Sequence, residues 1–309
     1  MRLSAAALIL GALMLSGCAR QPLLRPAGVM APLELAATPF FPQDAYQCGP
    51  AALATVLAAA GVTVTPAALV PEVYVPARRG SLQPELVAAA RRRGRQPVPL
   101  PAELSGLRTA LASQAPVLVL LNQGLRIWPV WHYAVVVGLD PLTDVVVLRS
   151  AETRRAVVPA ERFLRQWRAA GAWGVTLHAA DAPPPWAELA DWLDTVSVWA
   201  RTGQTTLALT ATATAVRRWP RAASAWLAHG NALYARSQPG AAAAAFERAL
   251  ALQPTAGGYN NLAHVLTELG CRDAALAAVS TARSRYGEYP LLAQTASAAA
   301  ALPVDNCVR

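Results

Sequence analysis

A cysteine at the start of an expected helix is the residue whose type and position best suit nucleophilic chemistry. Cys48 stands directly before Gly49 and Pro50, and an alanine-rich apolar run follows. A proline in the first helical turn loses no needed N–H, so the sequence predicts a helix over 50–60 with Cys48 at its N-terminus. The free N–H groups and the helix dipole favour an anion there, which predicts a lowered thiol pKa. Gln47 precedes the cysteine, and its side-chain amide is a candidate donor to the oxyanion of a tetrahedral intermediate.

A cysteine nucleophile needs a base, and His132 is the candidate among four histidines. It stands near the start of the β-rich apolar stretch 131–140, which predicts a buried strand with the histidine at its mouth. A histidine at the edge of a strand also occurs as a core residue whose hydrogen bonds are satisfied. Its pairing with Cys48 favours the catalytic interpretation.

These two stretches together resemble the papain-like cysteine peptidases that process the double-glycine leaders of bacteriocins. That family carries a Gln-x4-Cys-Gly or Gln-Cys-Gly-Pro segment opening a helix, then a His-Tyr or His-Phe strand, then an acidic residue on the next strand. The resemblance covers roughly residues 39–180. It implies that Cys48 is the nucleophile, His132 the general base and acid, and Gln47 the oxyanion donor. It also implies an α+β papain-like domain, in which an antiparallel sheet packs on the cysteine-bearing helix.

The third member of the expected triad departs from the family pattern. The strand after the histidine strand is expected over 144–149, and no aspartate ends it. The candidates to orient His132 are Ser150 at the matching place, Glu152 just beyond it, and Asp140 and Asp144 in the intervening turn, with a backbone carbonyl as a further acceptor. Ser150 is preferred first, Asp140 second and Glu152 third. Asp140 and Asp144 flank a proline, so these two residues also suit a hairpin turn.

Residues 1–17 have the features of an export signal, because one arginine precedes an apolar run that is too short to span a bilayer. Leu15-Ser16-Gly17-Cys18 resembles the lipobox of bacterial lipoproteins, which implies diacylglycerol on the sulfur of Cys18. Ala19 stands where many lipoproteins carry an inner-membrane retention aspartate, which implies attachment to the outer membrane, facing the periplasm. The proline-containing segment 18–38 is expected to be a tether between lipid and domain.

A helical repeat region is expected after the prolines at 183–185, over residues 186–290, with a C-terminal tail over 291–309. Apolar, small and proline residues recur there at the spacings of tetratricopeptide units: Trp226, Gly230, Ala242, Phe246, Ala249 and Pro254, then Leu262, Ala263, Gly270, Ala275 and Ala282. A degenerate earlier copy fits Trp192, Ala208, Ala215 and Pro220. Three such units are the usual minimum, since each buries its apolar face on the next.

Cysteine usage gives one more expectation. The chain has four cysteines, and assigning Cys18 to lipid and Cys48 to chemistry leaves Cys271 and Cys307. An exported chain meets an oxidising compartment, so we expect these two to form a disulfide that pins the C-terminal tail to the last repeat.

Composition limits the classes of function. Hydrophobic residues make up 54% of the chain and charged residues 15%, which favours packed structure over disorder. The formal charge is +9, but the arginines are scattered, and the run 91–95 suits a helix C-terminus, so nucleic acid is not an expected partner. No metal or cofactor is expected. The predicted function is a lipid-anchored cysteine peptidase acting on a peptide or protein, with a protein partner bound by the repeats. The alternative is a papain-like lipoprotein that binds or assembles without turnover.

Overall fold

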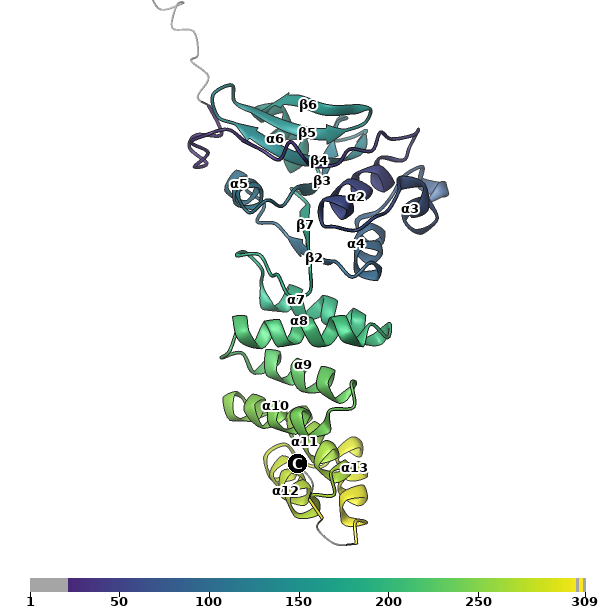
Figure 1. The fold of residues 1–309 in the computed structure, drawn as a ribbon, viewed down its shortest axis with the longest axis vertical. Helices are drawn as coiled ribbons and strands as arrows, with labels where there is room; N and C mark the ends of the chain where they lie inside the picture. The colour runs from purple at the N-terminus through teal and green to yellow at the C-terminus, as the bar shows by residue number, and fades with distance from the viewer. Residues whose placement is uncertain (1–21, 304–305, 308–309) are drawn as a thin grey trace, which may run out of the picture.

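The computed structural model describes residues 22–303, 306 and 307. Its N-terminal region combines an antiparallel sheet with helices, and its C-terminal region is a stack of helices that extends away from the sheet (Figure 1). The predicted fold class, an α+β domain followed by an all-helical region, is confirmed. The signal segment and Cys18 lie outside the described residues.

The described part of the N-terminal region contains one seven-stranded sheet, in which the main path of strands is β2-β7-β3-β4-β5-β6 and β1 pairs with β4. Every pairing in it is antiparallel. The strands are β1 (Leu33–Glu34), β2 (Gln96–Pro99), β3 (Val117–Asn122), β4 (Trp131–Asp140), β5 (Val145–Ser150), β6 (Thr153–Pro159) and β7 (Gly174–His178). The continuous apolar runs of β3 and β4 are buried along almost their whole length, as expected for strands covered on both faces.

Two strands at the ends of this path, β2 and β6, were not expected from the sequence. Strand β2 contains two prolines, which cannot donate to a ladder and are tolerated at sheet edges. Strand β6 is mostly exposed and carries adjacent arginines, so it lacks the apolar run that marks a central strand. Edge position explains why both lack the usual strand pattern.

Helices cover both faces of the sheet. They are α2 (Cys48–Ala59), α3 (Pro66–Val73), α4 (Gln83–Arg92), α5 (Leu104–Ala112) and α6 (Ala160–Arg168). Alternate residues of a strand point to opposite faces. Accordingly, Tyr133, Val135 and Val137 of β4 pack in a core with α2, α3 and α4, while Ala134 and Val136 pack in a second core with α5 and α6.

The segment expected as a tether is packed against the domain over its described part. Leu24 and Val29 are fully buried in the core on the α5 and α6 face. The carboxylate of Asp144 accepts hydrogen bonds from the backbone N–H groups of Leu23 and Leu24, at 2.9 and 3.0 Å. The expectation of a free tether up to residue 38 is therefore wrong from residue 23 onward, because the apolar side chains between the prolines have a core to enter.

The C-terminal region consists of paired antiparallel helices. They are α7 (Leu189–Arg201), α8 (Thr205–Arg218), α9 (Ala223–Tyr234), α10 (Pro239–Leu252), α11 (Ala256–Glu268), α12 (Arg272–Tyr286) and α13 (Pro290–Ala300). Helices α7 to α12 give the three helix pairs that the repeat pattern predicted. Small residues permit close packing: a Cβ on Gly230 would lie 2.4 Å from a ring carbon of Phe246 on the paired helix.

The boundary predicted after residue 290 needs correction. Residues 291–309 were expected as a tail, but α13 occupies Pro290–Ala300 and packs on α11 and α12. Its Leu292 and Ala299 are fully buried. An alanine-rich segment with few large side chains gives a weak amphipathic pattern, which explains why the sequence did not reveal this helix.

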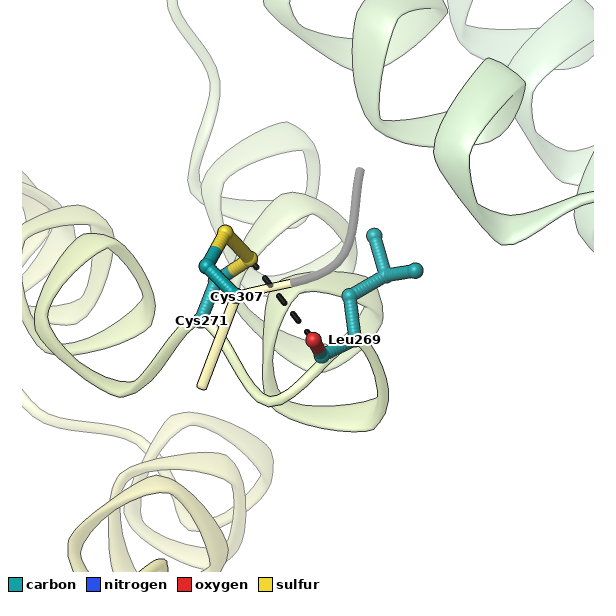
Figure 2. The surroundings of a disulfide bond; sticks show 3 residues. All are labelled: Leu269, Cys271 and Cys307. Carbon is teal, nitrogen blue, oxygen red and sulfur yellow. Dashed lines mark hydrogen bonds between the residues drawn. A yellow bond between two sulfur atoms is a disulfide. The ribbon is translucent and has the colours of Figure 1, made fainter. Parts of the chain in front are cut away.

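The chain end beyond α13 is held by the expected disulfide between Cys271 and Cys307, whose Cα atoms are 4.1 Å apart (Figure 2). The backbone N–H of Asn306 donates to the Gly270 carbonyl at 3.0 Å. Cys271 Sγ also lies 3.8 Å from the Leu269 carbonyl oxygen (Figure 2), a contact without a donated proton because the sulfur is oxidised. Residues 306 and 307 are thereby fixed beside the start of α12.

The two regions meet where α7 packs on α4 and β2. Trp199 donates its indole N–H to the Arg91 carbonyl at 2.8 Å, and Arg91 Nε donates to Thr195 Oγ1 at 3.0 Å. The side chain of Gln96 on β2 donates to the Trp192 carbonyl at 2.8 Å. Both tryptophans are fully buried, so the junction is a packed interface rather than a free linker. Across the described residues, no helix has the length and apolar character needed to cross a bilayer.

Candidate active site

Cys48 is the first residue of α2, with Gln47 as the N-cap and Pro50 in the first turn, as predicted. It is the free cysteine of the described chain and is partly buried. Burial raises the pKa of the Cys48 thiol, while the backbone N–H groups of Tyr133, Gly49 and Cys48 itself act to lower it. The net direction is upward, so the lowered pKa expected from the helix terminus is wrong. The loss of hydration outweighs the N–H groups here.

His132 is the second residue of β4 and is 8% exposed. Its Nε2 lies 2.8 Å from Ser150 Oγ. Ser150 is the residue that the sequence ranks first as the partner of His132, because of its place in the next strand. Arg149 pairs with Val135, so Ser150 at the end of β5 falls close to the start of β4. Burial lowers the pKa of the His132 imidazole, because desolvation disfavours the charged ring.

Cys48 and His132 line the same cleft, which has a volume of about 590 Å³. Its walls come from the segment before α2, the loop before α4 and the start of β4: Gln43, Tyr46, Cys48, Arg78, Arg79, Gly80, Ser81, Leu82, Pro129, Trp131, His132 and Tyr133. Both Cys48 and His132 belong to the described residues, and no hydrogen bond joins the two side chains there. The elements thus bring the pair to one cleft without a hydrogen bond between the two side chains.

Two glutamines close to Cys48 are candidates for the oxyanion donor, the predicted Gln47 and Gln43. Gln47 caps α2 through its backbone and does not line the cleft, whereas Gln43 does. The backbone N–H of Gln43 donates to the Ala151 carbonyl at 3.3 Å, which ties this residue to the turn after Ser150. Four residues separate Gln43 from Cys48, the Gln-x4-Cys spacing, so the signal was present in the sequence.

The remaining acidic candidates form no hydrogen bond with the His132 side chain within the described residues. Asp140 is at the opposite end of β4, about 26 Å along the strand at 3.3 Å per residue. Its carboxylate accepts from the Leu142 N–H and the Thr143 hydroxyl, both at 2.8 Å, which is turn chemistry. Asp144 holds the N-terminal segment as described above. Glu152 is exposed in the turn after β5.

The loop that precedes His132 is shaped by Asn122, whose side-chain oxygen accepts from the Gly124 and Val130 N–H groups at 2.9 and 3.0 Å. Two tryptophans lie in this part of the chain, Trp128 and Trp131. Trp131 lines the cleft, whereas Trp128 is 73% exposed and does not.

No protein-family model matches the chain, and no curated protein matches it. Solved structures similar to parts of it include a protein described as a C39-like peptidase from Bacillus anthracis, with 18% identity and a TM-score of 0.40 over 47% of this chain and 96% of that one. The peptidase domain of Streptococcus ComA is 22% identical, with a TM-score of 0.37 over 46% of this chain and 98% of that one. MamA is 23% identical, with a TM-score of 0.34 over 36% of this chain and 65% of that one. Because each TM-score is below 0.5, none of these likenesses assigns a function to the chain.

Proposed function

We propose that the N-terminal region is a cysteine peptidase, a thiol hydrolase acting on a peptide or protein. The observation that carries this proposal is the meeting of Cys48 and His132 in one cleft while Ser150 occupies the far nitrogen of the imidazole. With Nε2 held by Ser150, Nδ1 is the ring nitrogen left for the thiol. A nucleophile, a base and a group that orients the base are the three parts that such chemistry needs.

In the proposed reaction, Cys48 Sγ attacks the scissile carbonyl carbon and its proton passes to His132. The carbonyl oxygen becomes an oxyanion, which the backbone N–H of Cys48 and the side-chain amide of Gln43 stabilise. The protonated His132 then gives its proton to the leaving amine as the C–N bond breaks. Water, deprotonated by His132, hydrolyses the thioester and restores the thiol.

The resting charge state follows from burial. Burial raises the pKa of Cys48 and lowers that of His132, so it favours the thiol and the neutral imidazole over the charged pair. Proton transfer therefore accompanies attack on the substrate, and a resting thiolate-imidazolium pair contributes little. A neutral hydroxyl on His132 supports the imidazolium less than a carboxylate does, so we expect slow turnover.

The same features favour a second candidate, a papain-like lipoprotein that binds or assembles other proteins without turnover. A raised thiol pKa and a neutral partner on the histidine are what a site that has lost catalysis would retain. Reactivity of Cys48 separates the two candidates.

Purified protein is treated near neutral pH with a peptidyl electrophile that labels cysteine peptidases, and the labelled residue is identified by peptide mass mapping. We expect labelling of Cys48 that is abolished in Cys48→Ala and falls by about a hundredfold or more in His132→Ala, because general base catalysis contributes on that scale. His264→Ala is the matched control, since His264 lies on α11, outside the cleft. A native protein that resists the probe at every pH tested would leave the binding lipoprotein as the better proposal.

We further propose that Cys18 carries the lipid and that the protein faces the periplasm from the outer membrane. The support is the lipobox resemblance alone, and Cys18→Ala should abolish fatty-acid labelling and release the chain from membranes. The helical region is proposed to bind a protein partner. Grooves of about 400 and 220 Å³ lie along it, the first lined mainly by α7 and α9 and the second by α9, α11 and α13.

A further inference from the structure

The cleft that holds Cys48 and His132 has a one-sided charge. Its lining includes two arginines, Arg78 and Arg79, and no aspartate or glutamate. Both arginines are exposed, and neither forms an ion pair within the described residues. Other arginines of this region do have partners: Arg92 and Arg93 bind Glu72. The cleft thus contains two guanidinium groups without a carboxylate partner from the chain.

The backbone that carries these arginines is tightly built. A single 3₁₀ turn, η1 (Pro76–Arg78), is closed by pairing of Val75 with Gly80, in which the Val75 N–H donates to the Gly80 carbonyl at 2.8 Å. Arg79 follows in the left-handed conformation, with φ of 47°. Such a conformation costs a non-glycine residue on the order of 1 kcal/mol and persists when the surroundings impose it.

The guanidinium of Arg79 lies over the ring of Tyr46, which also lines the cleft. Its central carbon lies 5.8 Å from the centre of the Tyr46 ring, within the range of a cation–π contact. Tyr46 is itself left-handed, with φ of 63°, and stands two residues before Cys48. Two strained residues from separate segments therefore meet beside the candidate nucleophile, and their contact positions a charge there before any substrate binds.

We propose that Arg78 and Arg79 form a carboxylate-binding subsite, so that the substrates of this site carry an acidic side chain or a free C-terminal carboxylate close to the scissile bond. This inference rests on the proposed function, because it describes what the nucleophile of the cleft acts on. Arginine suits the role since its planar fork matches the two oxygens of a carboxylate. The Tyr46 ring lowers the entropy that Arg79 loses on binding.

The test compares two reagents that differ only in charge. In both iodoacetate and iodoacetamide, Cys48 Sγ forms a bond to the methylene carbon, the C–I bond breaks and iodide leaves, with the thiol proton passing to His132 or water. The full chain is used, alkylation of Cys48 is followed by peptide mass mapping, and each rate is divided by that of glutathione to remove intrinsic reactivity. We expect the ratio of the iodoacetate rate to the iodoacetamide rate to fall about threefold or more in the Arg78→Gln/Arg79→Gln double variant. A change of this size corresponds to the loss of two exposed charges that attract the carboxylate.

Arg126→Gln is the matched control, because it removes an exposed arginine of the neighbouring loop that does not line the cleft. Arg126→Gln should leave the iodoacetate-to-iodoacetamide ratio unchanged, because the arginine that it removes lies outside the cleft. The contribution of His132 is the same in the native protein, the double variant and Arg126→Gln. A ratio that stays constant in the double variant, or falls equally in Arg126→Gln, would overturn the subsite. If neither reagent alkylates Cys48 in the native protein, the proposed function itself fails and the subsite with it, which is a different result from alkylation without selectivity.

Short peptides then assign the source of the carboxylate by protection of Cys48 from iodoacetamide. Alanine pentapeptides with a central Glu or Gln and blocked ends test a side chain, and alanine pentapeptides with a free or amidated C-terminus test the chain end. Protection by one carboxylate form over its amide, lost in the double variant, supports the subsite and names the source. Equal protection by acid and amide in both sets would contradict it.

Discussion

The two regions of the molecule differ in how far apart in sequence the residues are whose contacts hold each region together. In the N-terminal region, Cys48 on α2, His132 on β4 and Ser150 on β5 meet although they are distant in sequence. In the helical region each helix packs on the next, and polar contacts join neighbouring repeats, as between Asn231 and Asn261 at 3.0 Å. A site made of distant parts depends on the whole sheet, whereas a stack of helices can lose its last unit while the rest remains folded.

The largest effect that tests this comparison is expected from loss of the disulfide. Cys307→Ser opens a link across 36 residues, which in the chain-entropy model destabilises the last helices by about 4 kcal/mol. Hydrogen exchange followed by mass spectrometry should show faster exchange in α12 and α13 and unchanged exchange in the sheet. The variant is made at Cys307 because Cys271 is fully buried and its replacement would also alter the core.

Unchanged labelling of Cys48 in Cys307→Ser is the second readout. Faster exchange throughout the sheet, or loss of Cys48 labelling, would show that the two regions unfold as one unit and that the comparison is wrong.

A matched pair of glycine variants is expected to have the next largest effect. A Cβ on Gly49 would lie 2.3 Å from Ser81 Oγ, and a Cβ on Gly230 would lie 2.4 Å from the Phe246 ring. Overpacking of this kind costs about 1–3 kcal/mol at either position. Chemical denaturation should report similar losses, but only Gly49→Ala should slow labelling of Cys48, because it shifts the start of α2 against β4.

The double variant Gly49→Ala/Ser81→Gly is the control for this pair, since it removes the obstructing side chain. It should recover stability and labelling together. Equal loss of labelling in Gly230→Ala would mean that packing in the helical region reaches the cleft.

The sequence predicted the parts of the fold whose signals are local. An apolar run identified β4, Pro50 placed Cys48 at the start of α2, and repeat spacing gave the helix pairs. Position at the end of the next strand was enough to rank Ser150 first as the partner of His132, a contact that the structure contains.

Features that depend on contacts between distant segments could not be predicted in this way. Burial of Leu24 requires a core built by α5 and α6, and the raised pKa of Cys48 reflects the desolvation produced by packing against β4. Gln43 is a different case, because its spacing to Cys48 was visible. Adjacency to Cys48 favours Gln47, but Gln47 is the N-cap of α2 and does not line the cleft.

The smallest expected effect concerns Ser150, the residue at which the site departs from a carboxylate triad. In Ser150→Asp a negative charge would stand beside the His132 ring, and an opposite charge at this range favours the protonated imidazole and raises its pKa. The imidazolium in turn stabilises the Cys48 thiolate and lowers the thiol pKa. In the native protein burial moves both pKa values the other way, so alkylation of Cys48 should increase mainly as the pH rises above the ordinary range of a cysteine thiol. The variant should therefore react with iodoacetamide about tenfold faster near neutral pH, and its alkylation rate should begin to rise at a lower pH, because each unit of pKa corresponds to about 1.4 kcal/mol.

Ser150→Asn is the matched control, similar in size to aspartate but uncharged, and should show neither change. A native rate that is already constant from weakly acid to neutral pH would mean that the pair rests as thiolate and imidazolium, and that the hydroxyl of Ser150 is as good a partner for His132 as a carboxylate.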